Sequence, residues 1–341
     1  MIIVQFYFRR EPMYEAILEI NIDAIPKVIL NTSVYTSIYN EDLTHEEYIL
    51  DTLKNYFQPR NSNKDTVTIT NLTDYERVSH NRFRGFLLDH STIENEHQLS
   101  ATSMMTKKIM REMQNDLEID GYINSINVLL DDLRDNLKGT LPLSIKSFDL
   151  KQFIKLLSFE YDYSEDYARL ITRLEQVVPL VVDEMDYQAK EKAFVIYLYP
   201  EAGLSIKEQI RFRKILNNLP VPVIVLTESP CFLSESIKGL NYFINNVQMI
   251  TKSFFEDSYW NAPINVEKEQ IEERFEYLFV KYCSVLEIKP IISNYLLADI
   301  IVFNDIDLYI IVSFLKHCNL EYQLDIDKTK ISLALSTYLF S

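Results

Sequence analysis

The chain has 341 residues, a hydrophobic content of 47% and a formal net charge of −16 at pH 7. This length predicts two domains, or one core with an addition, and the apolar content is ample for a core. Taken alone, the negative charge argues against nucleic acid as a partner. Glycine occurs only 5 times, which disfavours a phosphate-binding loop, because such loops need glycine for close backbone approach.

Cysteine spacing and terminal composition indicate a reducing compartment. Cys231, Cys283 and Cys318 are widely spaced and form no CxxC or Cys/His ligand pattern. We therefore expect reduced, buried thiols rather than a zinc site or a disulfide framework. The N-terminal charges follow a short apolar run, the reverse of a secretory signal, and aspartates interrupt the apolar stretches near the C-terminus. The expected location is the cytoplasm, without membrane contact.

The first third of the sequence reads as strands followed by a helix. A helix is expected from Ser33 to Phe57, with Asn31 and Thr32 as capping candidates. In P-loop proteins the phosphate loop lies at such a strand-to-helix junction. Here the junction reads "KVILNTSVYTSIYN" and contains neither a glycine nor a GxxxxGK[ST] motif, which predicts no nucleotide binding at this place. Strands are expected at residues 2–8, 14–22, 27–30 and 66–70.

Two long helical regions are expected next, at residues 96–138 and 149–184. The first has a predicted break at Asp120-Gly121, and an apolar stripe recurs every four residues at Met105, Ile109, Met113 and Leu117. The block "AFVIYLYPEAGLSIKEQIRFRKILNNLPVPVIVLT" then reads strand, helix, strand, which predicts a parallel βαβ unit. A helix near Leu233, a strand over residues 242–250 and an amphipathic helix over 266–286 complete the pattern.

The order of elements predicts an α/β fold class with three parts. Residues 1–92 and 186–255 form an α/β head, residues 93–185 form a helical leg inserted in the head, and residues 256–341 form a helical C-terminal extension. Charge is unevenly distributed along the chain, and a locally neutral window could present a basic face. Residues 77–155 carry 11 basic and 11 acidic groups, whereas residues 256–341 carry 7 and 14.

Several basic residues of the balanced window are candidates for binding phosphates. Lys107, Lys108 and Arg111 fall within one helical stretch, on the polar flank of the apolar stripe. Arg82 and Arg84 share one side of the chain if the segment is extended. The sixth candidate is Lys146.

No catalytic constellation stands out. His80, His90 and His97 fall in a polar, turn-like segment without a neighbouring nucleophile, and acid pairs such as Asp131-Asp132 resemble solvated helix faces. Glu201 follows the first strand of the βαβ unit, where a second metal-binding acid of a P-loop enzyme would lie, but it is a weak candidate. We expect no enzyme activity.

Five blocks of the sequence together resemble a known family. They are "REPMYEAILEINIDAIPKVIL", "GFLLDHSTIENEHQLSATSMMTKKIMREM", "YINSINVLLDDL", "LSIKSFDLKQFIKLLSF" and the βαβ block. Their order is similar to the spacer-acquisition (adaptation) protein of type II-A CRISPR systems. The resemblance covers residues 1–250, and the remainder resembles the extension of the long members of that family.

The resemblance implies a head like that of P-loop NTPases without the phosphate loop, and a homotetrameric ring around linear double-stranded DNA. It also implies that CRISPR integrase proteins and an effector nuclease are partners. Shorter members bind calcium through an acidic run, but the matching segment "LSIKSFDL" offers only Asp149, too few oxygen ligands for calcium. No metal residue is assigned and no cofactor is required. A nucleotide-dependent P-loop-like NTPase and an acidic protein-protein scaffold remain the alternatives.

Overall fold

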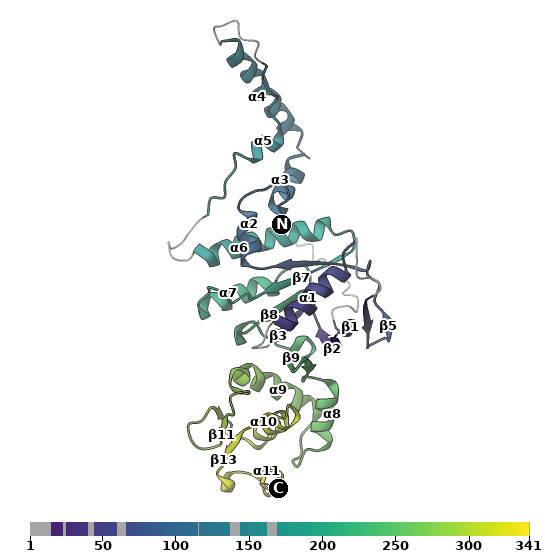
Figure 1. Ribbon diagram of the computed structural model, residues 1–341. Coiled ribbons are helices and arrows are strands. Elements are labelled where there is room, and N and C mark those ends of the chain that lie inside the picture. The colour runs from purple at the N-terminus through teal and green to yellow at the C-terminus, as the bar shows by residue number, and fades with distance from the viewer. Residues whose placement is uncertain are drawn as a thin grey trace, which may run out of the picture.

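The structure is a computed structural model that describes residues 15–22, 25–39, 44–59, 66–114, 116–136, 144–161 and 169–340. The molecule is elongated (Figure 1). We call its middle part, with two β-sheets and their covering helices, the head. We restrict the name leg to α3 to α5, because residues 171–185, predicted as part of the leg, share an apolar cluster with the central sheet. The leg projects from one end of the head, and the extension, from α8 to α11, lies at the other end.

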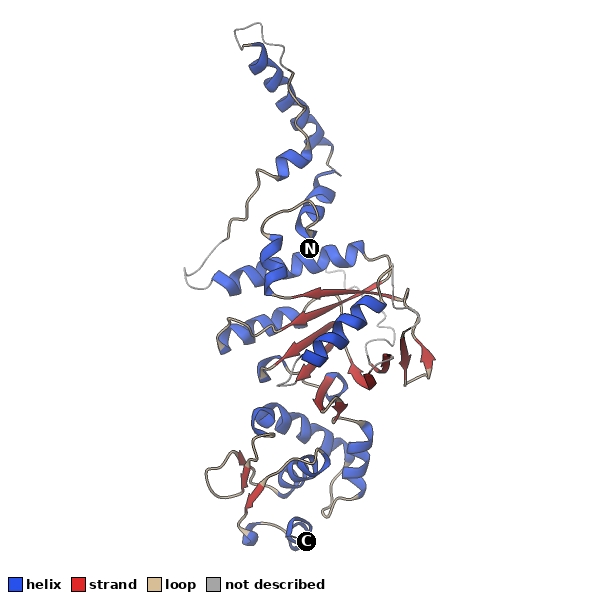
Figure 2. Ribbon diagram, viewed as in Figure 1, coloured by secondary structure: helices blue, strands red, loops and turns tan. Residues whose placement is uncertain are grey.

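A six-stranded sheet forms the centre of the head (Figure 2), in the order β10-β9-β3-β8-β7-β6. Neighbouring strands from β9 to β6 are parallel, and only β10 is antiparallel to its neighbour. β7 and β8 flank α7 in sequence, so the predicted βαβ unit is confirmed, as is the α/β fold class. The bounds are β3 (Tyr35–Tyr39), β6 (Phe83–Leu88), β7 (Lys192–Leu198), α7 (Ile206–Asn217), β8 (Val223–Thr227), β9 (Leu240–Ile244) and β10 (Val247–Gln248).

Alternating side chains of the central strands bury both faces of this sheet. Phe194 and Ile196 of β7 point into one apolar cluster, while Val195 and Tyr197 point into the other, as the two-residue period of a strand requires. α1 (Thr44–Tyr56) contributes to the first cluster, and α6 (Arg169–Gln188) and α7 contribute to the second. A second, four-stranded antiparallel sheet has the order β2-β1-β4-β5, and apolar side chains of β1, β2 and β4 belong to the first cluster. Its strands are β1 (Ala16–Ile22), β2 (Ile25–Thr32), β4 (Val67–Asn71) and β5 (Glu76–Arg77).

The leg leaves the head after β6. Its elements are α3 (Met104–Gln114), α4 (Leu117–Asp135) and α5 (Leu150–Ile154), and α2 (His90–Glu96) precedes them. No residue of α4 is buried. Asn127 of α4 holds the returning chain, because its side chain both donates to the Phe148 carbonyl and accepts from the Phe148 N–H, over 2.9 and 2.6 Å.

The extension has a core of its own that continues into the head. Tyr39 and Tyr242, on two strands of the central sheet, belong to the same apolar cluster as Phe279 and Phe314 of the extension. The helices are α8 (Lys252–Trp260), α9 (Lys268–Tyr282), α10 (Asp305–His317) and α11 (Leu333–Phe340). A small parallel sheet, β12-β11-β13, which we did not predict, joins them. Its strands are β11 (Ile291–Ser293), β12 (Ile300–Ile301) and β13 (Gln323–Asp325).

The expected helix from Ser33 to Phe57 is wrong in its first part. Residues 35–39 form β3, a fully buried central strand, and α1 begins only at Thr44. Asn31 and Thr32 end β2 and cap no helix. Thr36 and Ser37 made β3 look unlike a buried strand, but their hydroxyls accept hydrogen bonds from the backbone N–H groups of residues 33 and 234, which satisfies them inside the core.

Other boundaries also differ from expectation. The break in the first leg helix falls between Gln114 and Leu117 rather than at Asp120-Gly121, because Asp116 caps α4 by accepting from the Glu118 N–H. The region 149–184 contains two helices, α5 and the first part of α6, instead of one. The helix expected near Leu233 does not form: Leu233 lies between two short 3₁₀ helices, Pro230–Phe232 and Ile237–Gly239. The single strand expected over residues 242–250 is instead the β9–β10 hairpin. The expected strand at 2–8 lies outside the described residues.

None of the three cysteines forms a disulfide; Cys283 and Cys318 are buried, and Cys231 is partly exposed. Burial raises the pKa of Cys318 to about 12, so this thiol stays protonated and unreactive. Within the described part of the chain, no helix combines the length and the apolar character needed to cross a bilayer.

Candidate nucleic-acid interface

Lys108, expected on the solvent side of the leg, lies against α6. Its Nζ is 2.5 Å from a carboxylate oxygen of Asp183 and 3.3 Å from one of Glu112, and its side chain is only 12% exposed. The hydrogen bond to Asp183 raises the pKa of Lys108. α3 is held in this position because Met105, three residues earlier, is buried in the apolar cluster that contains α6.

Arg111 makes a second link to α6. Its Nη2 is 2.9 Å from Oε2 of Glu184, whose side chain is 2% exposed, and its guanidinium lies 3.9 Å from the ring centroid of Tyr187. A buried carboxylate without such a partner would be costly. Lys107 is 3.5 Å from the side-chain oxygen of Gln188. These three cations therefore fasten the leg to the head, and their contact with DNA stays a prediction.

Three arginines near the β6 edge of the central sheet differ from these cations in their contacts, one of them in the four-stranded sheet and two at β6. Arg77 is the last residue of β5, Arg82 directly precedes β6, and Arg84 is the second residue of β6. The guanidinium groups of Arg82 and Arg84 lie over Phe83 and Phe86, at 5.6 and 5.9 Å from the ring centroids. Among the described residues, the ion pairs of arginine are those of Arg111, Arg134, Arg173, Arg211 and Arg274, and none involves these three arginines. Their charges are therefore available to an anionic partner.

Two lysines extend this basic surface. Lys192, the first residue of β7, pairs in register with Phe83 of β6, and Lys190 lies two residues earlier and is exposed. We call Arg77, Arg82, Arg84, Lys190 and Lys192 the β6 surface. Sequence reasoning found only Arg82 and Arg84. The parallel pairing of β6 with β7 places the backbone of Lys192 next to that of Phe83, between Arg82 and Arg84 in the chain, and no local sequence pattern reports that pairing.

Lys146 lies away from the β6 surface, on the returning chain of the leg. It is exposed, in the extended segment before α5. Nearby Asp149 caps α5, because its side chain accepts from the Gln152 N–H at 2.8 Å. Throughout the described ranges, no group of three or more His, Cys, Asp or Glu side chains is arranged to hold a metal ion.

Carboxylates occupy the carboxyl ends of the parallel strands, where open α/β sheets usually bind ligands. Glu201 follows β7 and Glu228 follows β8. Burial raises the pKa of Tyr199, and the carboxylates of Glu47 in the first turn of α1, Glu228 and Glu201 raise it further. Glu201 is itself engaged. It accepts from the Thr227 hydroxyl at 2.7 Å and from the Glu228 N–H at 2.8 Å. A nucleotide phosphate at this edge would meet three carboxylates.

His90, at the carboxyl end of β6, is also part of the frame. Its Nδ1 is 2.8 Å from the hydroxyl of Tyr197, and burial lowers its pKa. His97 contacts the rings of Phe159 and Tyr161, at centroid distances of 5.1 and 5.4 Å. Both histidines thus have packing roles that the sequence pattern did not show.

Comparison with known proteins adds a likeness in fold. No family model and no curated protein matches the sequence. The crystal structure of Stu0660 of Streptococcus thermophilus is similar, with a TM-score of 0.59 over 95% of this chain and 99% of that chain. The two sequences are 15% identical. The likeness therefore concerns the fold along almost the whole length of both chains.

Proposed function

We propose that this protein is a non-catalytic, sequence-independent binder of linear double-stranded DNA, acting as a tetrameric ring in CRISPR spacer acquisition in the cytoplasm. The function comes from the resemblance of the five sequence blocks to the type II-A adaptation protein. The fold likeness to Stu0660 over 95% of the chain is compatible with a shared architecture.

The observation that carries the proposal is the β6 surface. In a chain of net charge −16, Arg77, Arg82 and Arg84 lie within eight positions of one another and none is neutralised by a described carboxylate. Exposed arginine side chains bind backbone phosphates without reading sequence. Within a ring, the same surface of several copies would act together, while the acidic extension faces elsewhere.

The absence of catalysis is supported by the carboxyl edge of the sheet. The β3-to-α1 connection reads "NEDL" at residues 40–43, with two acidic residues and no glycine or lysine. Glu47, Glu201 and Glu228 add three carboxylates near Tyr199. Both features disfavour a bound triphosphate, because carboxylates repel its negative charge. This argues against the P-loop-like NTPase.

The ring and its partners are further parts of the proposal. The homotetramer, the integrase proteins and the effector nuclease are proposed from the resemblance alone. In a closed ring, DNA can enter only by an end. A linear duplex should therefore bind, whereas a small covalently closed circle should not.

The test is fluorescence anisotropy with a labelled linear duplex, a closed circle of the same sequence, and the linear duplex with Mg-ATP added. We expect binding of the linear form alone, unchanged by ATP. Equal affinity for both forms would exclude a closed channel. Failure of the protein to bind any duplex at low salt would reject the function and favour the acidic scaffold.

A further inference from the structure

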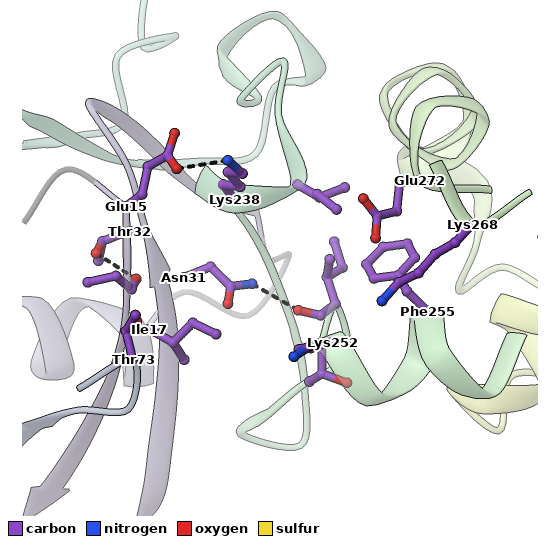
Figure 3. Close-up of a pocket in the computed structure, with 14 residues that line it drawn as sticks. Glu15, Ile17, Asn31, Thr32, Thr73, Lys238, Lys252, Phe255, Lys268 and Glu272 are labelled. Carbon is purple, nitrogen blue, oxygen red and sulfur yellow. Dashed lines mark hydrogen bonds and ion pairs between the residues drawn. The ribbon is translucent and has the colours of Figure 1, made fainter. Parts of the chain in front are cut away.

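A cavity lies where the head meets the extension, and none of its lining residues belongs to the leg or to the β6 surface. It has a volume of about 320 Å³, near the lower end of the range for small-molecule sites. β1 and β2 form one wall, and α8 and α9 form the other (Figure 3). We call it the junction pocket. Its ionisable lining residues are Glu15, Lys238, Lys252, Lys268 and Glu272.

The charges of the junction pocket are unevenly matched. Lys238 is paired with Glu15 at 2.8 Å. Lys252 and Lys268 share one carboxylate, that of Glu256, at the long distances of 3.6 and 3.7 Å. Such exposed, long ion pairs contribute little stability. Both ammonium groups can therefore turn toward a better anion at small cost.

The N-terminus of α8 adds hydrogen-bond donors beside these lysines. Thr251 caps the helix, and its hydroxyl and carbonyl accept from the N–H groups of Phe254 and Phe255. The two preceding N–H groups, of Lys252 and Ser253, have no acceptor among the described residues. Unpaired N–H groups at the positive end of a helix dipole attract anions.

An apolar lining faces the charged groups. Ile17, Ile237, Ile250 and Phe255 belong to the wall of the pocket, and Ile250 and Phe255 are buried. This combination suits a ligand with an anionic head and an organic body. A bare inorganic anion would leave the apolar wall in contact with water, and a long polymer would not enter a cavity of about 320 Å³.

We propose that the junction pocket binds a phosphate monoester, with its phosphate between Lys252, Lys268 and the N-terminus of α8. A phosphate monoester carries a charge of about −1.5 to −2 at pH 7 and three acceptor oxygens, so it competes well with the single, shared Glu256 carboxylate. The organic body packs on Ile17 and Ile237, the partly exposed apolar residues of the lining. The phosphate can belong to a small metabolite or to the 5′ end of a nucleic acid, since both present the same group.

The test is calorimetry on the full chain with AMP, adenosine and inorganic phosphate. AMP should bind, adenosine should not, and phosphate should bind more weakly than AMP. The double variant Lys252→Ala, Lys268→Ala should lose affinity for AMP by about tenfold or more, since it loses two charge-assisted hydrogen bonds. The matched control Lys289→Ala, Lys316→Ala removes two lysines of the extension outside the pocket and should bind as the wild type does.

A second variant guards against an effect on folding. Thr73→Trp adds bulk at an exposed residue of the lining and removes no charge, so it should block AMP while the melting temperature stays unchanged. Duplexes with and without a 5′ phosphate then identify the source. A preference for the phosphorylated end that the lysine variant abolishes indicates a nucleic-acid terminus, and no preference indicates a metabolite. If AMP does not bind, or binds the double variant equally well, the proposal is wrong, whatever the result for duplex binding.

Discussion

The Nε of Arg111 donates a hydrogen bond to Oε2 of Glu184 over 3.0 Å, and this contact joins the first helix of the leg to the head. The leg therefore begins as part of the head. Only beyond Gln114 does the chain leave the apolar core, because α4 has no buried residue.

Reversing the charge of Arg111 should destabilise the protein. Arg111→Glu would place two carboxylates together at a buried position of α6, and we expect a clear fall in the urea midpoint. The exchanged pair Arg111→Glu, Glu184→Arg should recover part of the loss in a double-mutant cycle. A midpoint unchanged in the single variant would show that the pair contributes nothing.

Two glycines should respond oppositely to alanine. A Cβ at Gly85 would lie 2.7 Å from Cζ of Phe194 and 3.1 Å from the backbone of Lys54, so Gly85→Ala should cost about 1–3 kcal/mol through overpacking. At Gly121 no atom lies within 4 Å of the added Cβ. Gly121→Ala, inside α4, should therefore stabilise by up to about 1 kcal/mol, if α4 unfolds with the rest. Chemical denaturation of both variants decides, and equal effects would contradict the packing of α1 on β6.

The partly buried position of His90 predicts a pH dependence of stability. Because burial lowers its pKa in the folded protein, the unfolded chain binds the proton more tightly, and stability should fall as the pH drops below about 6.5. The slope from one group is at most about 1.4 kcal/mol per pH unit, and less here because His90 is only partly buried. Urea midpoints of wild type and His90→Gln between pH 8 and 5.5 should diverge in this sense. A His80→Gln control retains His90 and should keep the wild-type slope, whereas parallel profiles of wild type and His90→Gln would reject the assignment.

The β6 surface should set the salt dependence of duplex binding. Each phosphate contact contributes about −0.9 to the slope of log K against log salt, so Arg82→Ala, Arg84→Ala should make the slope less steep by up to about 2 per subunit. Charge-preserving changes to lysine should have little effect, since no base contact is expected. Lys289→Ala, in the extension, is the control. An unchanged slope in the arginine variant would mean that DNA lies elsewhere.

The strongly periodic parts of the sequence predicted the fold well. Strands β7 and β8 are uninterrupted apolar runs, and α7 between them carries helical spacing and a Ser205–Glu208 capping box, so the βαβ unit could be predicted from local signals alone. β3 could not, because Thr36 and Ser37 become acceptable in a core only when residues 33 and 234 supply their hydrogen bonds. The donor at residue 234 lies almost 200 positions away in the chain.

The candidate site shows the same limit. The sequence identified Lys108 and Arg111 as basic residues on a polar helix flank, which is where they lie, but not that Asp183 and Glu184 of α6 face them. Their partners are more than 70 residues distant in the chain. The sequence therefore predicted which residues are basic and on which side of the helix they lie, but not which carboxylates of another helix pair with them.

The extension shares an aromatic cluster with the head, whereas the outer leg (α4) does not, so the head depends on the extension more than on the outer leg. Tyr242 of β9 lies 5.3 Å from Phe279 between ring centroids, and its hydroxyl donates to Glu287 at 2.5 Å. A chain ended after residue 255 would leave Tyr39 of β3 and Leu240 and Tyr242 of β9 without most of their apolar cluster. The extension therefore permanently covers this part of the head, and evolution could shorten the extension only if those three residues changed with it. The outer leg, in contrast, can vary in length without altering any buried contact of α4.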